Sequence, residues 1–134
     1  MQPFLWNVRV YYEDTDAGGI VYYANYLKFM ERGRTEWLRS LGVEQDTLLE
    51  HSVAFVVKQV EMENHRPARF NDLLCISSQI VELKRASLVF QQHIYNENND
   101  LLVSARIKVA CVDISKMKPQ AIPKFILGEL SSVI

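Results

Sequence analysis

The sequence has few of the residues that cross-link small proteins or bind metals. Its 134 residues include only two cysteines and three histidines. Cys75 and Cys111 each lie in an alternating strand pattern, and neither has a second Cys or a His at the spacing of a metal site. We therefore expect two core thiols, no disulfide and no bound metal or cofactor.

The sequence also has no excess of either charge and no long apolar run. Its 15 basic and 16 acidic residues give a formal net charge of −1, which does not indicate a nucleic acid as partner. No segment approaches the roughly 20 apolar residues of a membrane span. Residues 1–10 show neither the basic nor the apolar region of a signal peptide. We expect one cytoplasmic domain over residues 1–134, large enough for a modest core.

Several common catalytic motifs are missing as well. The chain has no G-x-S-x-G, no H-E-x-x-H and no P-loop, so serine-hydrolase, zinc-hydrolase and nucleotide-phosphate mechanisms lack their usual signatures. His51, His65 and His93 are widely separated and share no motif with a Ser or Cys nucleophile. We interpret these histidines as structural or exposed residues.

The most informative segment that is present joins a strand pattern to a long helix pattern. Apolar residues alternate over residues 4–12, the two-residue period of a strand with one buried face. Beyond this segment, apolar side chains recur every three or four residues, which predicts a helix. The apolar face of this helix consists of Tyr22, Tyr26, Phe29, Met30, Gly33, Trp37 and Leu41. The other face consists of Lys28, Glu31, Arg32, Arg34, Glu36 and Arg39.

Acidic residues and a glycine pair lie between these two patterns. Gly18 and Gly19 permit a sharp turn, and the helix start beyond them offers unpaired N–H donors and positive dipole density. Asp16 could act there as a general base on water or attack a carbonyl itself, while backbone amides of residues 21–25 hold the developing oxyanion. The alternative interpretation is that residues 14–16 are ordinary turn residues that bond their own backbone or cap the helix.

Other candidates for this chemistry have simpler interpretations. Glu31 and Glu36 alternate with arginines, which favours a solvated helix face with ion pairs over acid–base work. Lys84 and Arg85, and three lysines within residues 116–124, form two basic clusters at strand ends or loops. These clusters could hold the phosphates of an anionic ligand, or they could be solvated loop charges.

The chain after the helix predicts an antiparallel sheet. Gly42 suits a left-handed cap at the helix end. The following patterns predict one more turn of helix at 44–51, strands at 53–63, 74–83, 87–95 and 101–111, a loop at 115–123 and a short helix at 125–133. The last three strands, joined by short turns, indicate a meander, and the broad apolar face of the long helix predicts that the sheet wraps around it. Long edge strands need cover, which dimerisation would supply.

The loop, the helix and a later segment together resemble one protein family. The resemblance rests on YYEDTDAGGIVY at 11–22, Asn25-Tyr26, ERGRTE at 31–36, and Val112-Asp113 with KMKP at 116–119. These segments are similar to hot-dog-fold acyl-CoA thioesterases of the 4-hydroxybenzoyl-CoA thioesterase type, on the branch of the YbgC family, the Tol-Pal-associated thioesterases of Gram-negative bacteria. The similarity extends over essentially the whole chain. It implies an α+β hot-dog fold, with an antiparallel sheet around a helix at 24–41, assembled as a homodimer or as a homotetramer built from two dimers.

The resemblance also implies an activity and the residues that perform it. The activity is hydrolysis of acyl-CoA to free acid and CoA, with Asp16 as the catalytic carboxylate and the backbone amide of Tyr23 polarising the thioester carbonyl. The residues implied to bind acyl-CoA are Gly19, Val21, Tyr22 and Asn25 and, at the rim against the coenzyme A phosphates, Lys84, Arg85 and Lys118. The branch commonly has His at position 23 and Ala at position 33. Tyr23 could change the rate or the acyl preference, and Gly33 could let the helix lie closer to the sheet.

Two rival functions stay open beside this one. A non-catalytic acyl-carrier or envelope-complex interaction module could keep the fold and turn over no acyl-CoA. A hot-dog dehydratase would need a His and an acid facing one another across the site, and the sequence shows no such pair near Asp16. The residues also leave open whether the thioester partner is acyl-CoA or an acyl carrier protein.

Overall fold

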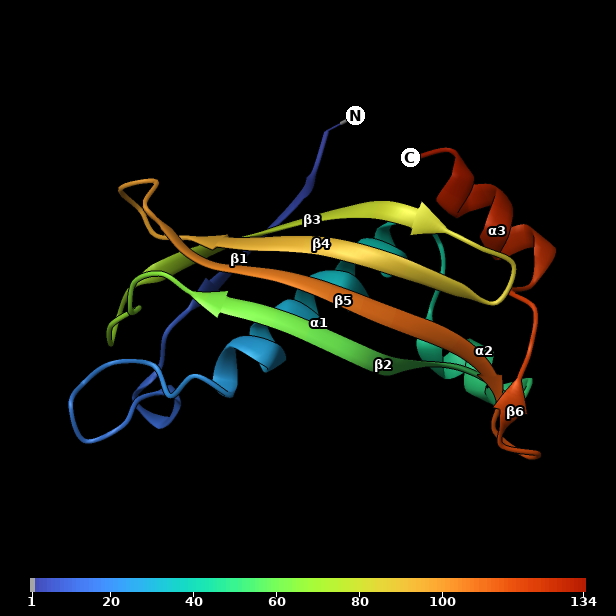
Figure 1. Ribbon diagram of the computed structural model, residues 1–134, viewed down its shortest axis with the longest axis horizontal. Coiled ribbons are helices and arrows are strands. Elements are labelled where there is room, and N and C mark those ends of the chain that lie inside the picture. Colours follow the sequence, from blue (N-terminus) through green and yellow to red (C-terminus); the bar gives the residue numbers. More distant parts are fainter. Residues whose placement is uncertain (1) are drawn as a thin grey trace.

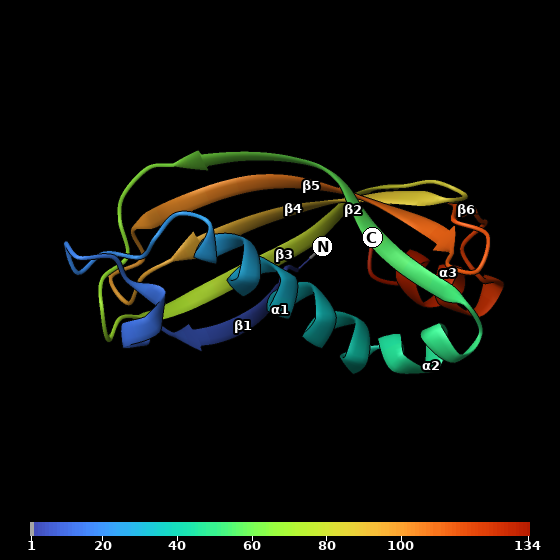
Figure 2. The same ribbon diagram turned by 90° about the horizontal axis from the view of Figure 1, so that it is seen from below.

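One long helix lies along the hollow of a curved antiparallel sheet in the computed structural model (Figures 1 and 2). The structure describes residues 2–134, so Met1, the first residue of the predicted domain, lies outside the described part. The elements are β1 (Phe4–Arg9), a 3-10 turn (Tyr12–Asp14), α1 (Asn25–Ser40), α2 (Gln45–Glu50), β2 (Val53–Asn64), β3 (Leu73–Leu83), β4 (Ser87–Tyr95), β5 (Leu101–Asp113), β6 (Lys118–Pro119) and α3 (Lys124–Ser131). This arrangement confirms the predicted α+β class.

The strands follow the order β1-β3-β4-β5-β2, and the short β6 pairs with β5. β3, β4 and β5 form the predicted meander, while β6 lies inside the segment predicted as a loop. β1 and β2, which flank α1 in the sequence, lie at opposite ends of this order. The chain therefore leaves one edge of the sheet, crosses the hollow as α1 and returns at the other edge (Figure 2).

The core fills the space between α1 and the hollow of the sheet. The predicted alternation holds along β5, where Val103, Ala105, Ile107, Val109 and Cys111 are all buried. Gly42 ends the helix segment with a φ of +82°, the left-handed conformation that glycine adopts without strain. Cys111 is buried, as predicted for a core thiol, whereas Cys75 is only half-buried.

The predicted helix faces are wrong at two positions. Tyr22 lies before the start of α1 and is 51% exposed. It is not helical because the preceding residue, Val21, forms an isolated β-bridge with Thr15. The sequence predicts Arg34 on the polar face, yet only 9% of this residue is exposed. The hollow of the curved sheet covers more of the circumference of α1 than a flat surface would cover.

Gly33 allows α1 to approach the sheet closely. A Cβ atom added at this position would lie 3.0 Å from Cγ2 of Ile76 on β3, a distance at which one of the two groups must shift. The expectation from the sequence, that glycine here lets the helix lie closer to the sheet, is consistent with this contact.

The buried side-chain amide of Gln92 links α1 to β3 and β4. Gln92 on β4 is fully buried, and its Nε2 donates to the backbone oxygen of Met30 at 3.0 Å and to Oγ of Ser78 at 2.8 Å. Its Oε1 accepts a hydrogen bond from Nη1 of Arg34 at 3.0 Å. One side chain thus satisfies polar groups on the helix and on β3.

Replacing this amide should destabilise the protein. Gln92→Leu leaves the Arg34 guanidinium and the Met30 carbonyl without their buried partner, and we expect the free energy of unfolding to fall by about 1–3 kcal/mol. Urea unfolding followed by circular dichroism measures this change. Gln91→Leu, the same substitution on the opposite face of β4, is the control and should change stability by less than about 0.5 kcal/mol. Equal effects from both substitutions would contradict the role of the amide.

Candidate active site

Asp14 fixes both ends of the loop that connects β1 to α1. Its carboxylate accepts a hydrogen bond from the backbone N–H of Tyr11 at 2.8 Å. Its backbone oxygen accepts from the N–H of Tyr22 at 3.0 Å and from Nδ2 of Asn25 at 2.9 Å. Asn25, which the resemblance assigned to acyl-CoA binding, therefore uses a side-chain N–H to hold the loop.

Asp16 lies exposed in the tight turn at the middle of this loop. Its backbone N–H donates to the oxygen of Ile20 at 2.9 Å, and its backbone oxygen accepts from the N–H of Gly19 at 3.0 Å. Gly19 has a φ of +76°, which suits glycine. The Asp16 carboxylate accepts the N–H of Gly18 through Oδ1 at 2.8 Å, whereas Oδ2 accepts no hydrogen bond within residues 2–134. Asp16 therefore makes the hydrogen bonds of a turn residue, and Oδ2 is left without a donor from the described residues.

The segment at 66–70 holds the loop against α1. The N–H of Val21 donates to the oxygen of Ala68 at 2.9 Å, and the N–H of Phe70 donates to the oxygen of Gly19 at 3.2 Å. The N–H of Ala68 in turn donates to the hydroxyl of Tyr26 on the first turn of α1 at 3.0 Å. Burial raises the pKa of the Tyr26 phenol, which favours the neutral hydroxyl still further.

A turn at Tyr22 and Tyr23 leads into α1 and offers a backbone donor. The N–H of Asn25 donates to the oxygen of Tyr22 at 2.8 Å, and the N–H of Tyr26 donates to the oxygen of Tyr23 at 3.2 Å. The N–H of Tyr23 itself has no acceptor in the part of the chain that the structure describes. Donors of this kind are available to a ligand because the first turn of a helix cannot satisfy them.

A shallow pocket of about 350 Å³ lies beside this turn. It is lined by Ile20, Val21, Tyr23, Tyr26 and residues 64–67. The structure thus brings Val21 and Tyr23 to one surface, while Asp16 lies in the adjoining turn rather than on the pocket wall. The Tyr22 and Tyr23 rings are both exposed, with centroids 5.1 Å apart.

The three basic residues expected to meet phosphates lie in the β3–β4 turn and on β6, which are at the opposite end of the sheet from the loop before α1 (Figure 1). Lys84 and Arg85 occupy the turn between β3 and β4, and Lys118 lies on β6, opposite Asp113 at the end of β5. All three are exposed, and Nζ of Lys84 lies 3.1 Å from a carboxylate oxygen of Glu82. Within one chain, the structure does not bring these residues to Asp16.

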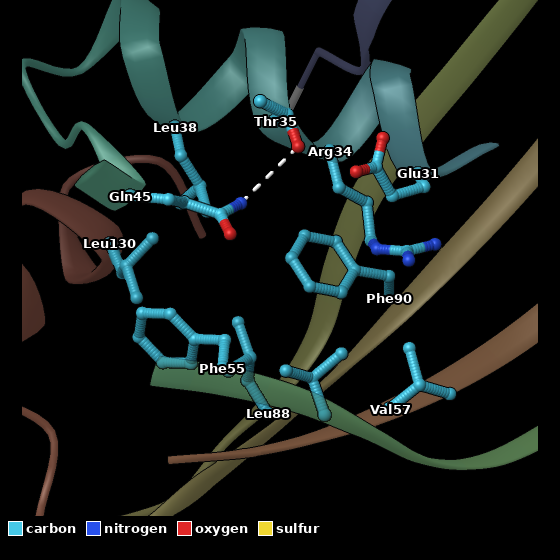
Figure 3. A pocket seen from close by; sticks show the side chains of 11 residues that line it. Glu31, Arg34, Thr35, Leu38, Gln45, Phe55, Val57, Leu88, Phe90 and Leu130 are labelled. Carbon is cyan, nitrogen blue, oxygen red and sulfur yellow. Dashed lines mark hydrogen bonds between the residues drawn. The ribbon is translucent and has the colours of Figure 1, made fainter. Parts of the chain in front are cut away.

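Sequence reasoning did not anticipate a cavity beside Arg34 (Figure 3). The cavity measures about 130 Å³ and lies between α1, the sheet, α2 and the end of α3. The available signal was spacing, since Arg34 is four residues after Met30 and four before Leu38, which puts it on the buried stripe of the helix.

Two classes of feature are absent from residues 2–134. No cluster of three or more His, Cys, Asp or Glu side chains could hold a metal ion there. No helix in this range combines the length and the apolar composition that crossing a membrane requires.

Comparison with known proteins gives consistent similarities. The sequence profile of the Thioesterase-like superfamily matches residues 10–130. The chain is 52% identical to the acyl-CoA thioester hydrolase YbgC of Escherichia coli O6:H1 over 94% of both chains. It is 51% identical to the acyl-CoA thioesterase YbgC of Haemophilus influenzae over 90% of this chain and 89% of that one.

A solved structure supports the same relationship. The crystal structure named "Probable Thioesterase from Bartonella henselae" superposes with a TM-score of 0.84 at 36% identity, over 90% of this chain and 99% of that chain. This match confirms the hot-dog arrangement of sheet and helix that the resemblance implied. The chain therefore belongs to the Thioesterase-like superfamily and, within it, to the YbgC family.

Proposed function

We propose that the protein hydrolyses the thioester of acyl-CoA to a free acid and CoA. The observation that carries this proposal is one short loop that offers both a carboxylate oxygen of Asp16 and the backbone N–H of Tyr23 without protein partners, within residues 2–134. The relatives that share about half of this sequence are named acyl-CoA thioester hydrolase and acyl-CoA thioesterase, which supports the same reaction.

The reaction needs one nucleophile and one oxyanion donor. The Tyr23 N–H, at the positive end of the α1 dipole, donates to the thioester oxygen as negative charge develops there. Asp16 either removes a proton from an attacking water or attacks the carbonyl carbon itself, forming an anhydride that water then cleaves. In both routes the carbon–sulfur bond breaks and the electron pair leaves with the CoA thiolate, which then takes up a proton. A thiolate leaves readily, so no histidine is needed as general acid.

The unpaired edge of β2 is the surface on which we propose that a second copy of the chain docks. Among the residues that the structure describes, β2 pairs with one strand, β5, along one of its two edges. Its Val56, Val57 and Val60 are between 40% and 50% exposed, an apolar surface on an edge that natural proteins normally cover. Antiparallel pairing of two such edges about a two-fold axis would cover it in both copies.

This two-fold pairing would also complete the site. It sets the Asn64 end of β2 beside the Val53 end of the partner's β2. The Asp16 loop lies near the Asn64 end, because it is tied to residues 66–70. Lys118 lies near the Val53 end, because Asp113 pairs with both Lys118 and Val53. We therefore propose that the phosphates of CoA in one site meet Lys84, Arg85 and Lys118 of the partner subunit.

A charge on the β2 edge should separate the subunits. We expect Val60→Lys to convert a dimer into monomers, since like charges would face one another across the two-fold axis, and to remove most turnover of acyl-CoA. Light scattering coupled to gel filtration measures the change in mass. Val81→Lys, at a valine of similar exposure on the internal strand β3, is the control and should stay dimeric. A parental protein that is monomeric and fully active would contradict this arrangement.

Substrate tests distinguish the rival functions. A binding module would hold acyl-CoA without releasing thiol. A dehydratase would form or hydrate a carbon–carbon double bond and would also leave the thioester intact. A panel of acyl chains, each presented on CoA and on acyl carrier protein, therefore separates all three functions and identifies the thioester partner.

A further inference from the structure

Ala68 holds the approach to α1 at two points. Its backbone oxygen accepts the N–H of Val21 at 2.9 Å, and its own N–H donates to the hydroxyl of Tyr26 at 3.0 Å. Ala68 is fully buried and Tyr26 is only 3% exposed, so these groups have little access to water that could replace the protein partners. Val21 and Tyr26 are thus the two ends of a stretch, residues 21–26, that is fastened to one support. Tyr23 lies within this stretch.

The segment that carries Ala68 is itself fixed to the sheet on both sides. Before Ala68, the N–H of His65 donates to the oxygen of Leu102 on β5 at 2.7 Å. After it, the N–H of Asn71 donates to the oxygen of Val10, directly behind β1, at 3.0 Å. Because both flanks are bonded to the sheet, Ala68 is a firm support for the loop.

The side chain of Tyr26 is held in place by packing. Its ring meets the ring of Phe29 edge-on, with centroids 6.3 Å apart, and both residues are buried. Tyr26 lies in the first turn of α1, so its hydroxyl connects the start of the helix to Ala68. The same side chain also lines the pocket beside Tyr23, which makes direct contact with a substrate the alternative role.

We propose that Tyr26 is a positioning residue for hydrolysis, whose hydroxyl holds Ala68 and thereby fixes residues 21–26 so that the Tyr23 N–H is aimed at the thioester oxygen. The inference rests on the proposed function, because that function makes the Tyr23 N–H the oxyanion donor. Such a donor works only at hydrogen-bond distance from the atom where charge develops. A displacement of about 1 Å can cost on the order of a hundredfold in rate.

Removing the hydroxyl alone tests this role. Tyr26→Phe keeps the ring that packs against Phe29 and removes the acceptor of the Ala68 N–H. We expect kcat for acyl-CoA hydrolysis to fall about tenfold and KM to stay within about twofold, because the affected contact forms in the transition state. Steady-state thiol release measures both constants. Tyr95→Phe, the same change at a half-buried tyrosine at the end of β4, is the control and should change neither.

A double-mutant cycle separates positioning from direct contact with the substrate. Tyr23→Pro has no N–H at position 23, so the Tyr26 hydroxyl has no donor left to position. Adding Tyr26→Phe to Tyr23→Pro should therefore lower kcat by less than about twofold, although the same change costs about tenfold in the parent. A hydroxyl that touched the substrate itself would cost about tenfold in both backgrounds.

Amide hydrogen exchange reports on the tether without using activity. In Tyr26→Phe, the amides of Ala68 and Val21 should exchange about tenfold faster or more, while those of the central strand β4 keep their parental rates. If Tyr26→Phe folds poorly, 4-aminophenylalanine at position 26 fills nearly the same volume with a weaker acceptor, and it should also lower kcat at unchanged KM.

Three results would overturn the role of Tyr26. They are a parental kcat in the folded variants at position 26, a rise in KM in place of the fall in kcat, and an equal loss of kcat with and without Tyr23→Pro. A parental protein that hydrolyses no acyl-CoA would instead contradict the proposed function itself, and the positioning role with it.

Discussion

Asp16→Asn should lower the rate of acyl-CoA hydrolysis by about a hundredfold or more while the fold and the assembly stay intact. The asparagine side chain keeps the shape of the carboxylate, and its oxygen can still accept the N–H of Gly18 that Oδ1 of Asp16 accepts now. The loop should therefore keep its turn. What the substitution removes is the charge that a general base or a nucleophile requires. Steady-state release of free thiol from acyl-CoA measures the change in rate.

Glu13→Gln provides the matched control for this substitution. Glu13 is an exposed residue in the same loop, three residues before Asp16. Its replacement by glutamine removes one negative charge from the loop, as Asp16→Asn does. Its turnover should stay close to that of the parent. If Asp16→Asn also kept near-parental turnover, Asp16 would not be the catalytic carboxylate, and Glu31 and Glu36 would become the candidates to examine.

Tyr23→Pro should reduce turnover about a hundredfold, because proline has no N–H to donate to the thioester oxygen. Tyr23→Phe and Tyr23→His keep that N–H, and we expect both to hydrolyse within about tenfold of the parent. Their exposed side chains should instead change which acyl groups fit. A comparison of kcat and KM over acyl-CoAs of increasing length separates these two effects.

The Tyr23 variants need two controls, one for the fold and assembly and one for the role of the phenol. Tyr23→Pro could disturb the turn before α1, so its mass in solution and its circular dichroism must match those of the parent. The Tyr23→Phe variant tests the backbone directly. If it lost activity on every acyl-CoA while assembling normally, the phenol would be the working group and the backbone N–H would not.

Most secondary structure could be predicted because its signals are local. The alternation along β5 and the three-to-four-residue period of α1 come from residues close together in the sequence. Gly42 marks the end of α1 through its own backbone preference. The order of the strands has no such local signal, since β1 pairs with β3 and β2 pairs with β5 across long stretches of chain.

The candidate site was only partly predictable for the same reason. The position of Asp16 in a turn before a helix follows from neighbouring residues. The tether from Ala68 to Tyr26 joins positions 42 residues apart, and no spacing rule reveals it. Arg34 was misassigned because a charged residue on a long helix is usually solvated, and only the depth of the hollow and the buried amide of Gln92 accommodate it.

Assembly is the least local property of all. The β3–β4 turn with Lys84 and Arg85, and β6 with Lys118, lie at the opposite end of the sheet from the loop before α1 (Figure 1). A motif match can assign them to a CoA site, but it does not distinguish residues of one chain from residues of two. The proposed dimer rests instead on the edge of β2, which has no partner strand within residues 2–134 and carries exposed valines.

The most direct test of thioester hydrolysis is the release of thiol from a panel of acyl-CoAs by the purified parental protein after exhaustive chelation of metals. We predict that at least one acyl-CoA yields free CoA and carboxylic acid in equal amounts over many turnovers, and that added divalent ions do not increase the rate. Tight binding of acyl-CoA with no thiol release across the whole panel would contradict the proposed function and would favour a binding module. Activity that returned only with one added metal ion would contradict the mechanism based on Asp16 and the Tyr23 amide.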